Sequence, residues 1–206
     1  MMMSLTDIKK QFNININGVI HIGAHYGQEY QEYYNNGIRN MIFFEPIKSN
    51  FQHLISTLSN ADGNIKSHNI ALGNFTGLKV MNIETANKGQ SCSILKPELH
   101  LKKYPTIVFN GKEIVSMDKL DNIAFDRKQF NMINIDVQGY ELEVFKGSVS
   151  TLRTVDIVYA EVNTEELYKD CVLVGELDEF LGRYDFKRVL TKMTKQGWGD
   201  ALYLKN

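Results

Sequence analysis

The stretch Val19–Gly27, with the sequence VIHIGAHYG, constrains the fold of this chain more than any other. Its apolar residues predict a short strand over Gly18–Ile22, and a glycine turn then leads into a helix predicted over Gln28–Asn35. Gly23 can adopt backbone angles closed to other residues, and without a side chain it lets a ligand approach the main chain. The first N–H groups of the helix have no internal partner and face whatever lies on the turn. The pattern therefore indicates either a ligand-binding turn or a tight turn that binds nothing.

The rest of the chain alternates short apolar runs with amphipathic segments. Further strands are predicted at Met41–Phe44, Ile65–Ala71, Leu78–Ile83, Asn131–Ile135, Val155–Val162, Phe186–Thr191 and Asp200–Leu204. Helices are predicted at Ser4–Asn13, Lys48–Leu58, Glu141–Leu152 with an interruption at Gly147, and Glu165–Leu181. Turns at Asn74–Gly77 and Asn110–Gly111 predict inserted β-hairpins. We therefore expect one α/β domain over residues 1–206, with a mostly parallel sheet, helices on both faces and an antiparallel C-terminal pair.

Composition excludes several classes of partner. A formal net charge of −1 argues against a general affinity for nucleic acid. No apolar run approaches the ~20 residues that cross a bilayer, and Met1–Lys10 lacks the apolar core of a signal peptide. Cys92 and Cys171 lie far apart and form no metal-ligand cluster. We expect no nucleic-acid partner, no membrane insertion and a cytoplasmic, reducing location; the three methionines at the start indicate a domain taken from a longer chain.

Polar residues follow the predicted strands at the positions where ligands bind in parallel sheets, beyond the carboxyl ends of the strands. The polar residues are Glu45, Asn69, Asp136 and Glu161, and Gly23 also follows a predicted strand. Glu45 comes about 20 residues after the glycine turn, where an acid can accept hydrogen bonds from both ribose hydroxyls. Its alternative role is that of an acid at the start of the helix after Pro46.

The glycine turn reads G-x-x-x-G, from Gly23 to Gly27. A nicotinamide cofactor normally requires G-x-G-x-x-G, because its pyrophosphate must touch the backbone. We therefore expect no NAD, and a nucleoside cofactor without a pyrophosphate, of which S-adenosylmethionine is the obvious candidate.

Asp136 and Glu161 are the candidate catalytic residues. Asp136 could hold a cofactor ammonium, bind a divalent cation such as Mg²⁺ or Mn²⁺ together with Glu161, or take a proton from a substrate hydroxyl. Asp136 could instead serve only as the N-cap of the next helix. Glu161 could instead be an ordinary polar residue of a loop. His21 is interpreted as a buried, hydrogen-bonded histidine, whereas His25 lies on the turn and could contact the cofactor. Cys92 has no partner base and is not predicted to be a nucleophile.

Several motifs, in this order, carry a family resemblance over roughly Gly18–Asn206. They are His21–Gly27, Phe44–Pro46, Asn69–Gly73 with Thr76–Gly77, Ser116–Leu120, Ile133–Gly147 and Asp200–Tyr203. In these motifs the chain resembles the FkbM family of S-adenosylmethionine-dependent methyltransferases, which have the class I Rossmann-like fold and mostly methylate hydroxyls of sugars and natural products.

The resemblance implies a cofactor site. Gly23, Ala24, His25 and Gly27 would cradle the methionine moiety, Glu45 beside Pro46 would bind the ribose, and Asn69, Ile70 and Ala71 would flank the adenine. Ser91 would lie in a loop beside the cofactor, and Asp136, with Gln138 in the same motif, would lie near the reacting methyl group. The family's first motif usually begins with aspartate, which here is His21, and its asparagine-type position is His25. The task of orienting the cofactor's amino group would then pass to Asp136 or a water.

The implied function is transfer of a methyl group to a hydroxyl of a sugar or glycan, by a domain that is fused to or works with glycosyltransferases. Two alternatives stay open. One is a methyltransferase for another small molecule, a lipid or a protein. The other is a non-catalytic binding module attached to a glycosyltransferase; the presence of Glu45 and Asp136 argues against an inert relic.

Overall fold

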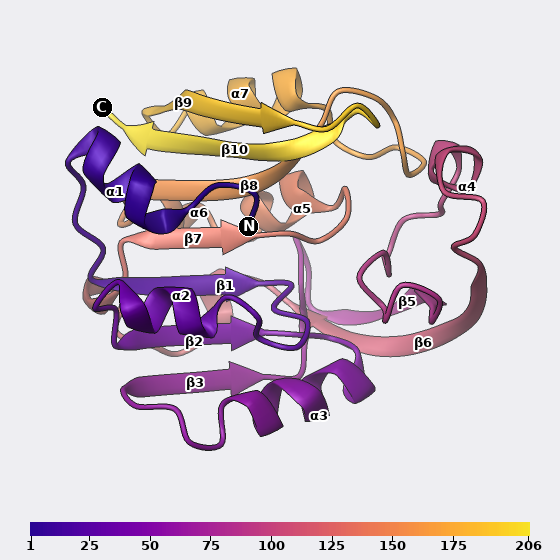
Figure 1. The fold of residues 1–206 in the computed structure, drawn as a ribbon, viewed down its shortest axis with the longest axis horizontal. Helices are drawn as coiled ribbons and strands as arrows, with labels where there is room; N and C mark the ends of the chain where they lie inside the picture. The colour runs from indigo at the N-terminus through magenta and orange to yellow at the C-terminus, as the bar shows by residue number, and fades with distance from the viewer.

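The computed structural model describes residues 1–206 and contains two β-sheets (Figure 1). The main sheet has seven strands, which in spatial order are β3 (Asn64–His68), β2 (Asn40–Phe44), β1 (Gly18–Ile22), β7 (Met132–Ile135), β8 (Ile157–Asn163), β10 (Trp198–Lys205) and β9 (Phe186–Met193). The first five are parallel to one another, and β10 is antiparallel to both β8 and β9. The predicted mostly parallel sheet with an antiparallel C-terminal pair is confirmed.

Helices cover both faces of the main sheet, as the sequence predicts. In β1, Val19 belongs to one buried cluster and Ile20 to another, because successive side chains point to opposite faces. The helices that pack in the Val19 cluster lie in front of the sheet in Figure 1 and are α1 (Leu5–Phe12), α2 (Tyr30–Asn35) and α3 (Lys48–Thr57). The Ile20 cluster holds α5 (Glu141–Lys146), α6 (Val149–Leu152) and α7 (Val174–Gly182). None of the helices has the length and apolar character needed to span a bilayer.

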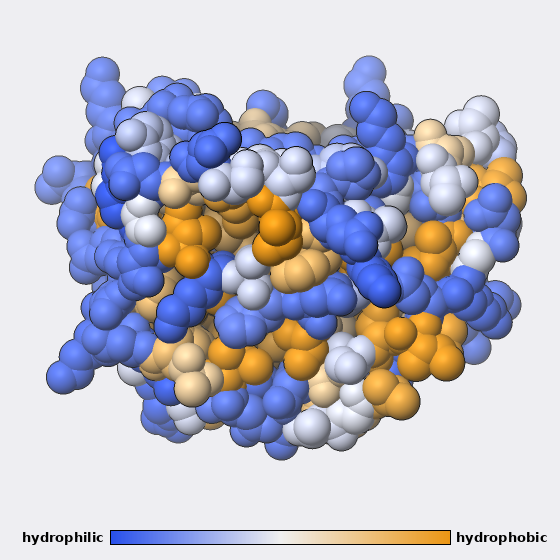
Figure 2. Space-filling view, turned by 90° about the horizontal axis from the view of Figure 1, so that it is seen from below, coloured by the Kyte–Doolittle hydropathy of each residue, from blue (hydrophilic) through white to orange (hydrophobic).

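An insertion between β3 and β7 lies beyond the carboxyl ends of the parallel strands (Figure 1). It consists of a three-stranded sheet, in the order β4 (Ala71–Leu72), β6 (Phe109–Asp118) and β5 (Gly77–Glu84), with α4 (Leu99–Lys103). The chain then returns to β7 through two short 3₁₀ helices at Leu120–Asn122 and Arg127–Gln129, and the second lies at the amino ends of the strands, where Gln129 accepts a hydrogen bond from Asn64. Figure 2 shows hydrophobic residues gathered at the surface on the side where this insertion lies, and Leu78, Val80 and Ile114 are exposed there.

The sequence-based prediction of this insertion was wrong in three respects. The predicted strand Ile65–Ala71 is divided between β3 and β4, because the Asn69 side-chain amide donates to the backbone oxygens of Glu45 and Pro46 and turns the chain out of the main sheet. The predicted hairpin after Asn74 does not form, since β4 and β5 both pair with β6 and not with each other.

The second hairpin, predicted at Asn110–Gly111, is also absent. Both residues lie inside the long strand β6, where the pairing shifts so that Ile83 faces Gly111 and Glu84 faces Phe109. An Asn–Gly pair suits such a bulge as well as it suits a tight turn, because Gly has no side chain to obstruct the extra residue. The local signal could not distinguish the two outcomes.

The long helix predicted over Glu165–Leu181 begins only at Val174. The chain before it runs against the insertion instead, with the His100 backbone N–H donating to the Leu167 oxygen at 2.9 Å and that of Lys169 donating to the Lys96 oxygen at 2.8 Å. Hydrogen bonds to a distant segment thus override a helical hydrophobic pattern. The segment before α7 also forms part of one wall of the space at the carboxyl end of the sheet.

Candidate active site

A cavity of about 400 Å³ lies at the carboxyl ends of β1, β2, β7 and β8, where the strand order reverses between β1 and β7. The structure brings most of the predicted site residues into its lining: Gly23, Ala24, His25, Glu45, Pro46, Ile70, Ala71, Ser91, Asp136, Gln138 and Glu161. Gly27 and Asn69 lie outside the lining. Asn69 instead fixes the backbone of Glu45 and Pro46, and Gly27 closes the turn by donating its N–H to the Ala24 oxygen at 2.8 Å.

The glycine turn is held between β2 and the segment after β7. The N–H groups of Gly23 and Ala24 both donate to the Phe44 oxygen, at 3.0 and 2.9 Å. Gly23 has a φ of +81°, and a Cβ atom there would lie 1.8 Å from the Asp136 backbone oxygen. Only glycine permits this approach, which brings the turn and Asp136 together.

Glu45 is linked to this turn through a buried carboxyl group. Its Oε2 accepts the N–H of His25 at 2.9 Å, and its Oε1 accepts the N–H of Ile47 at 2.9 Å. Each carboxylate oxygen has a second lone pair, so the group can also accept hydrogen bonds from a ligand in the cavity. Burial raises the pKa of Glu45 to about 7, although the two backbone hydrogen bonds act in the opposite direction.

His25 joins the turn to the insertion. Its Nε2 lies 2.8 Å from the Lys88 backbone oxygen and therefore donates to it, which leaves Nδ1 to accept from the Gln28 amide at 2.7 Å. The His25 ring stacks on Tyr26 with a centroid distance of 3.8 Å. The loop that carries Lys88 and Ser91 thus closes over the glycine turn.

The cavity has an apolar half and an acidic half. The apolar half is lined by Phe44, Ile70, Ala71, Leu72, Met81 and Cys92. Burial raises the pKa of the Cys92 thiol to about 12, so the thiol stays protonated. The acidic half contains Glu29, Asp136, Glu161 and Asp200.

In the acidic half, Gln138 bridges the two candidate catalytic carboxyl groups. Its Nε2 donates to Asp136 Oδ1 at 2.7 Å and to Glu161 Oε2 at 3.0 Å. Its Oε1 accepts the hydroxyl of Tyr168 at 2.9 Å, which fixes the orientation of the amide. The fully buried Glu141 supports this segment by accepting the N–H groups of Val137 and Gly139.

These carboxyl groups lie in one cavity and do not ionise independently. Burial raises the pKa of Asp136 to about 6; the Gln138 hydrogen bond opposes this change, and the charge of Asp200 adds to it. Burial also raises the pKa of Glu161 well above its usual range, and the charges of Asp136 and Glu141 act in the same direction. At neutral pH we therefore assign the charge to Asp136, which faces the cavity and meets water there, and the proton to Glu161.

The residues do not fit the predicted Mg²⁺ or Mn²⁺ site. A hard cation held by both carboxylates would lie between Asp136 and Glu161 and would need oxygen ligands around it. The amide nitrogen of Gln138 occupies that position instead. No group of three or more His, Cys, Asp and Glu side chains in the structure could hold a metal ion.

His21 is a buried histidine with partners, as predicted. Its Nδ1 lies 3.2 Å from the Tyr33 hydroxyl, and burial lowers its pKa to about 4, so the ring is neutral at pH 7. The neighbouring Glu29 lines the cavity and accepts the terminal ammonium of Met1 at 3.2 Å. Glu29 can therefore accept a hydrogen bond from an ammonium group, and it lies beside His21, which stands where the family usually has an aspartate.

Sequence reasoning missed several lining residues. The missed residues are Glu29 at the N-cap of α2, His100 and Tyr104 in the insertion, Tyr159 on β8 and Trp198 on β10. No local motif marks them, since their positions depend on tertiary packing. Asp200 belongs to a motif that the sequence did show, but its place in the cavity follows only from the pairing of Asp200 with Glu161 across β10 and β8.

Comparison with solved structures agrees with this fold. Solved structures with similar folds include Sp1610 of Streptococcus pneumoniae in complex with S-adenosyl-L-methionine, with a TM-score of 0.56, 12% identity, and coverage of 100% of this chain and 74% of that chain. Magnesium protoporphyrin IX methyltransferase (ChlM) from Synechocystis PCC 6803 with bound SAM has a TM-score of 0.53, 8% identity, and coverage of 91% of this chain and 69% of that chain.

The sequence comparisons are more specific about the family than the comparisons of folds. The 2-O-methyltransferase NoeI of Sinorhizobium fredii is 33% identical over 81 residues, which cover 38% of this chain and 33% of NoeI. The match thus spans about a third of that relative. The family model of the methyltransferase FkbM domain matches residues 21–188, from the strand before the glycine turn to the C-terminal strand pair. The chain therefore belongs to the FkbM methyltransferase domain family.

Proposed function

We propose that this chain is an S-adenosylmethionine-dependent O-methyltransferase that acts on a hydroxyl group of a sugar or glycan. The observation that carries the proposal is the single cavity in which the glycine turn and Glu45 adjoin the Asp136–Gln138–Glu161 group. Family membership and the partial match to NoeI, whose name specifies 2-O-methylation, support a hydroxyl acceptor.

The residues present fit the cofactor. The apolar half of the cavity, with Phe44, Ile70 and Leu72, suits an adenine ring, and Glu45 has free lone pairs for ribose hydroxyls. Glu29 already accepts an ammonium group, which makes it a second candidate besides Asp136 for the cofactor's amino group.

When bound, the cofactor supplies an electrophilic methyl group that the acceptor oxygen takes with displacement of the neutral thioether. Asp136 does the proton chemistry in this proposal. An acceptor hydroxyl is a weak nucleophile while protonated, and an ionised Asp136 with a pKa of about 6 can accept its proton near neutral pH. Gln138 positions Asp136 Oδ1, and the protonated Glu161 adds no second negative charge beside it.

Two measurements test the proposal. Calorimetry with S-adenosylhomocysteine should show one binding site, and incubation with labelled S-adenosylmethionine and a panel of glycans should give a methylated glycan by mass spectrometry. Binding without any turnover would favour the non-catalytic binding module. No binding at millimolar ligand would end the proposal.

A further inference from the structure

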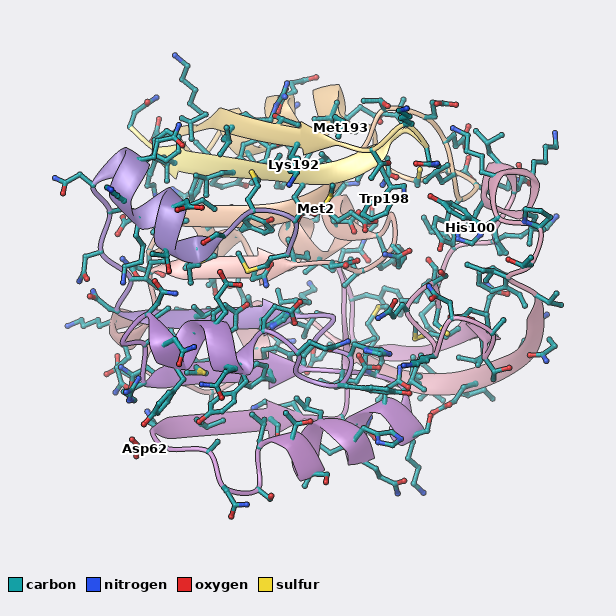
Figure 3. The ribbon with its side chains drawn as sticks, in the orientation of Figure 1. Met2, Asp62, His100, Lys192, Met193 and Trp198 are labelled. Carbon is teal, nitrogen blue, oxygen red and sulfur yellow. The ribbon has the colours of Figure 1, made fainter.

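One wall of the cavity is aromatic and adjoins the β8–β10 pair that carries Glu161 and Asp200. It is formed by His100 of α4, Tyr104 at the end of α4 and Trp198 at the start of β10. Trp198 Nε1 donates to the Tyr104 hydroxyl at 2.7 Å, and the His100 and Tyr104 rings lie 4.9 Å apart between centroids. Figure 3 shows Trp198 and His100 at the same end of the molecule, on elements far apart in sequence.

The pairing of β8 with β10 fixes this wall beside the candidate catalytic residues. Asn163 faces Trp198 across the two strands, and Glu161 faces Asp200. Side chains two residues apart on a strand point to the same face, and directly paired residues share that face. Asn163 therefore shares its face with Trp198 and with the two acids that line the cavity.

Two buried polar side chains in this region lack partners. His100 is 4% exposed and its Nδ1 makes no hydrogen bond, although the ring lines the cavity. Asn163 is 1% exposed, and neither its amide nitrogen nor its amide oxygen has a partner. Buried polar groups are nearly always hydrogen-bonded, because leaving them unpaired is costly. Asn163 lies outside the cavity lining, so His100 is the unpaired group that a ligand on the aromatic wall can reach. The unpaired His100 Nδ1 points to a ligand that supplies its missing partner.

We infer that this wall is the acceptor site and that it binds a sugar ring, an inference that rests on the proposed function. A sugar ring has an apolar C–H face that suits Trp198 and Tyr104, and hydroxyl groups at its edge that can pair with His100. A flat apolar acceptor would leave His100 Nδ1 unpaired, and a site with a buried polar group discriminates against a ligand that cannot pair with it. The hydroxyl that receives the methyl group is then directed toward Asp136.

Trp198 is the single tryptophan of the chain, so its fluorescence reports on this wall directly. The experiment titrates methyl glycosides of hexoses, 6-deoxyhexoses and N-acetylhexosamines into the complex with S-adenosylhomocysteine. We expect a saturable change in Trp198 fluorescence with at least one glycoside. His100→Phe should weaken glycoside binding about three- to tenfold, as expected for one lost hydrogen bond.

Binding of S-adenosylhomocysteine separates this inference from the proposed function. The His100→Phe variant should keep the wild-type affinity for that ligand, which also shows that the variant folds. The matched control His53→Phe changes an exposed histidine outside the cavity, and it should change neither the affinity for the glycoside nor that for S-adenosylhomocysteine. If glycosides are methylated while neither the Trp198 fluorescence nor glycoside binding by His100→Phe is affected, the acceptor-site assignment is wrong and the proposed function stands. If S-adenosylhomocysteine binds and only planar phenols change the fluorescence, the sugar assignment is wrong. If S-adenosylhomocysteine does not bind, the proposed function and this inference both fail.

Discussion

Cofactor binding should depend on the ionisation of Glu45. In the free protein this carboxyl group is 4% exposed, and burial raises its pKa to about 7. Ribose hydroxyls that donate to the carboxylate favour its charged form and lower the pKa again. Binding should therefore release a proton at pH 6, and the affinity should rise with pH. Replacing Glu45 with Gln, which has nearly the same shape and does not ionise, should remove this dependence.

The size of the effect follows from the pKa. At pH 6, one unit below a pKa of about 7, roughly nine of ten molecules carry the proton on Glu45 and must lose it, whereas at pH 8 only about one in ten does. If the bound-state pKa returns to the usual range, S-adenosylhomocysteine should bind about tenfold more tightly at pH 8 than at pH 6. At pH 8, Glu45→Gln should lose a further 1–3 kcal/mol of binding free energy, roughly 5- to 150-fold in Kd, for the lost charge-assisted hydrogen bonds.

The assay is titration calorimetry with S-adenosylhomocysteine at several pH values, in pairs of buffers that differ in ionisation enthalpy so that proton release is measured directly. Asp136 also titrates in this range, with a pKa of about 6, so Asp136→Asn serves as the control and should keep most of the pH dependence. Equal affinity at pH 6 and pH 8, or an unchanged affinity in Glu45→Gln, would refute the assignment of Glu45 to the ribose.

Three further predictions concern the acidic residues. Asp136→Asn should lower kcat on the order of 10²–10⁴-fold, and the wild-type rate should rise as pH increases through about 6; a fully active variant would remove Asp136 from the mechanism. EDTA should leave activity unchanged, since Gln138 occupies the position of a cation, and a loss restored by Mg²⁺ would contradict this. Burial raises the pKa of Glu141 from 4.5 to about 7, so the folded state holds this proton more tightly and stability falls as pH rises from 4.5 to 7, by about 3 kcal/mol. Glu141→Gln should flatten that decline in thermal melts at pH 5 to 8, and an unchanged decline would contradict it.

The main sheet could be predicted from the sequence because its signals are local. Gly18–Ile22 and Met132–Ile135 are short apolar runs that end in polar or glycine residues, and each strand has nearly the predicted bounds. The insertion could not be predicted in the same way. Its strands β4 and β5 both pair with β6, and no local pattern distinguishes that arrangement from two hairpins.

The candidate site also contains some residues that local signals predict and others that only tertiary contacts place. Gly23, Glu45 and Asp136 follow strands of the main sheet, so the rule for strand ends places them together, and the structure confirms that they share a cavity. Trp198 and His100 reach the cavity only because β10 pairs with β8 and because the insertion packs on the chain before α7. Their positions depend on contacts between distant segments, which the sequence pattern does not report.

The most direct test of the account is the fate of the transferred methyl group. The enzyme is incubated with S-adenosylmethionine carrying a ¹³C-labelled methyl group and with the methyl glycosides described above, and the products are followed by NMR. The account predicts a new methyl-ether signal on a sugar oxygen, formed together with S-adenosylhomocysteine and strongly reduced in Asp136→Asn. Label that stays on the cofactor with every glycoside, or that appears on a nitrogen or carboxyl group instead of a hydroxyl oxygen, would contradict it.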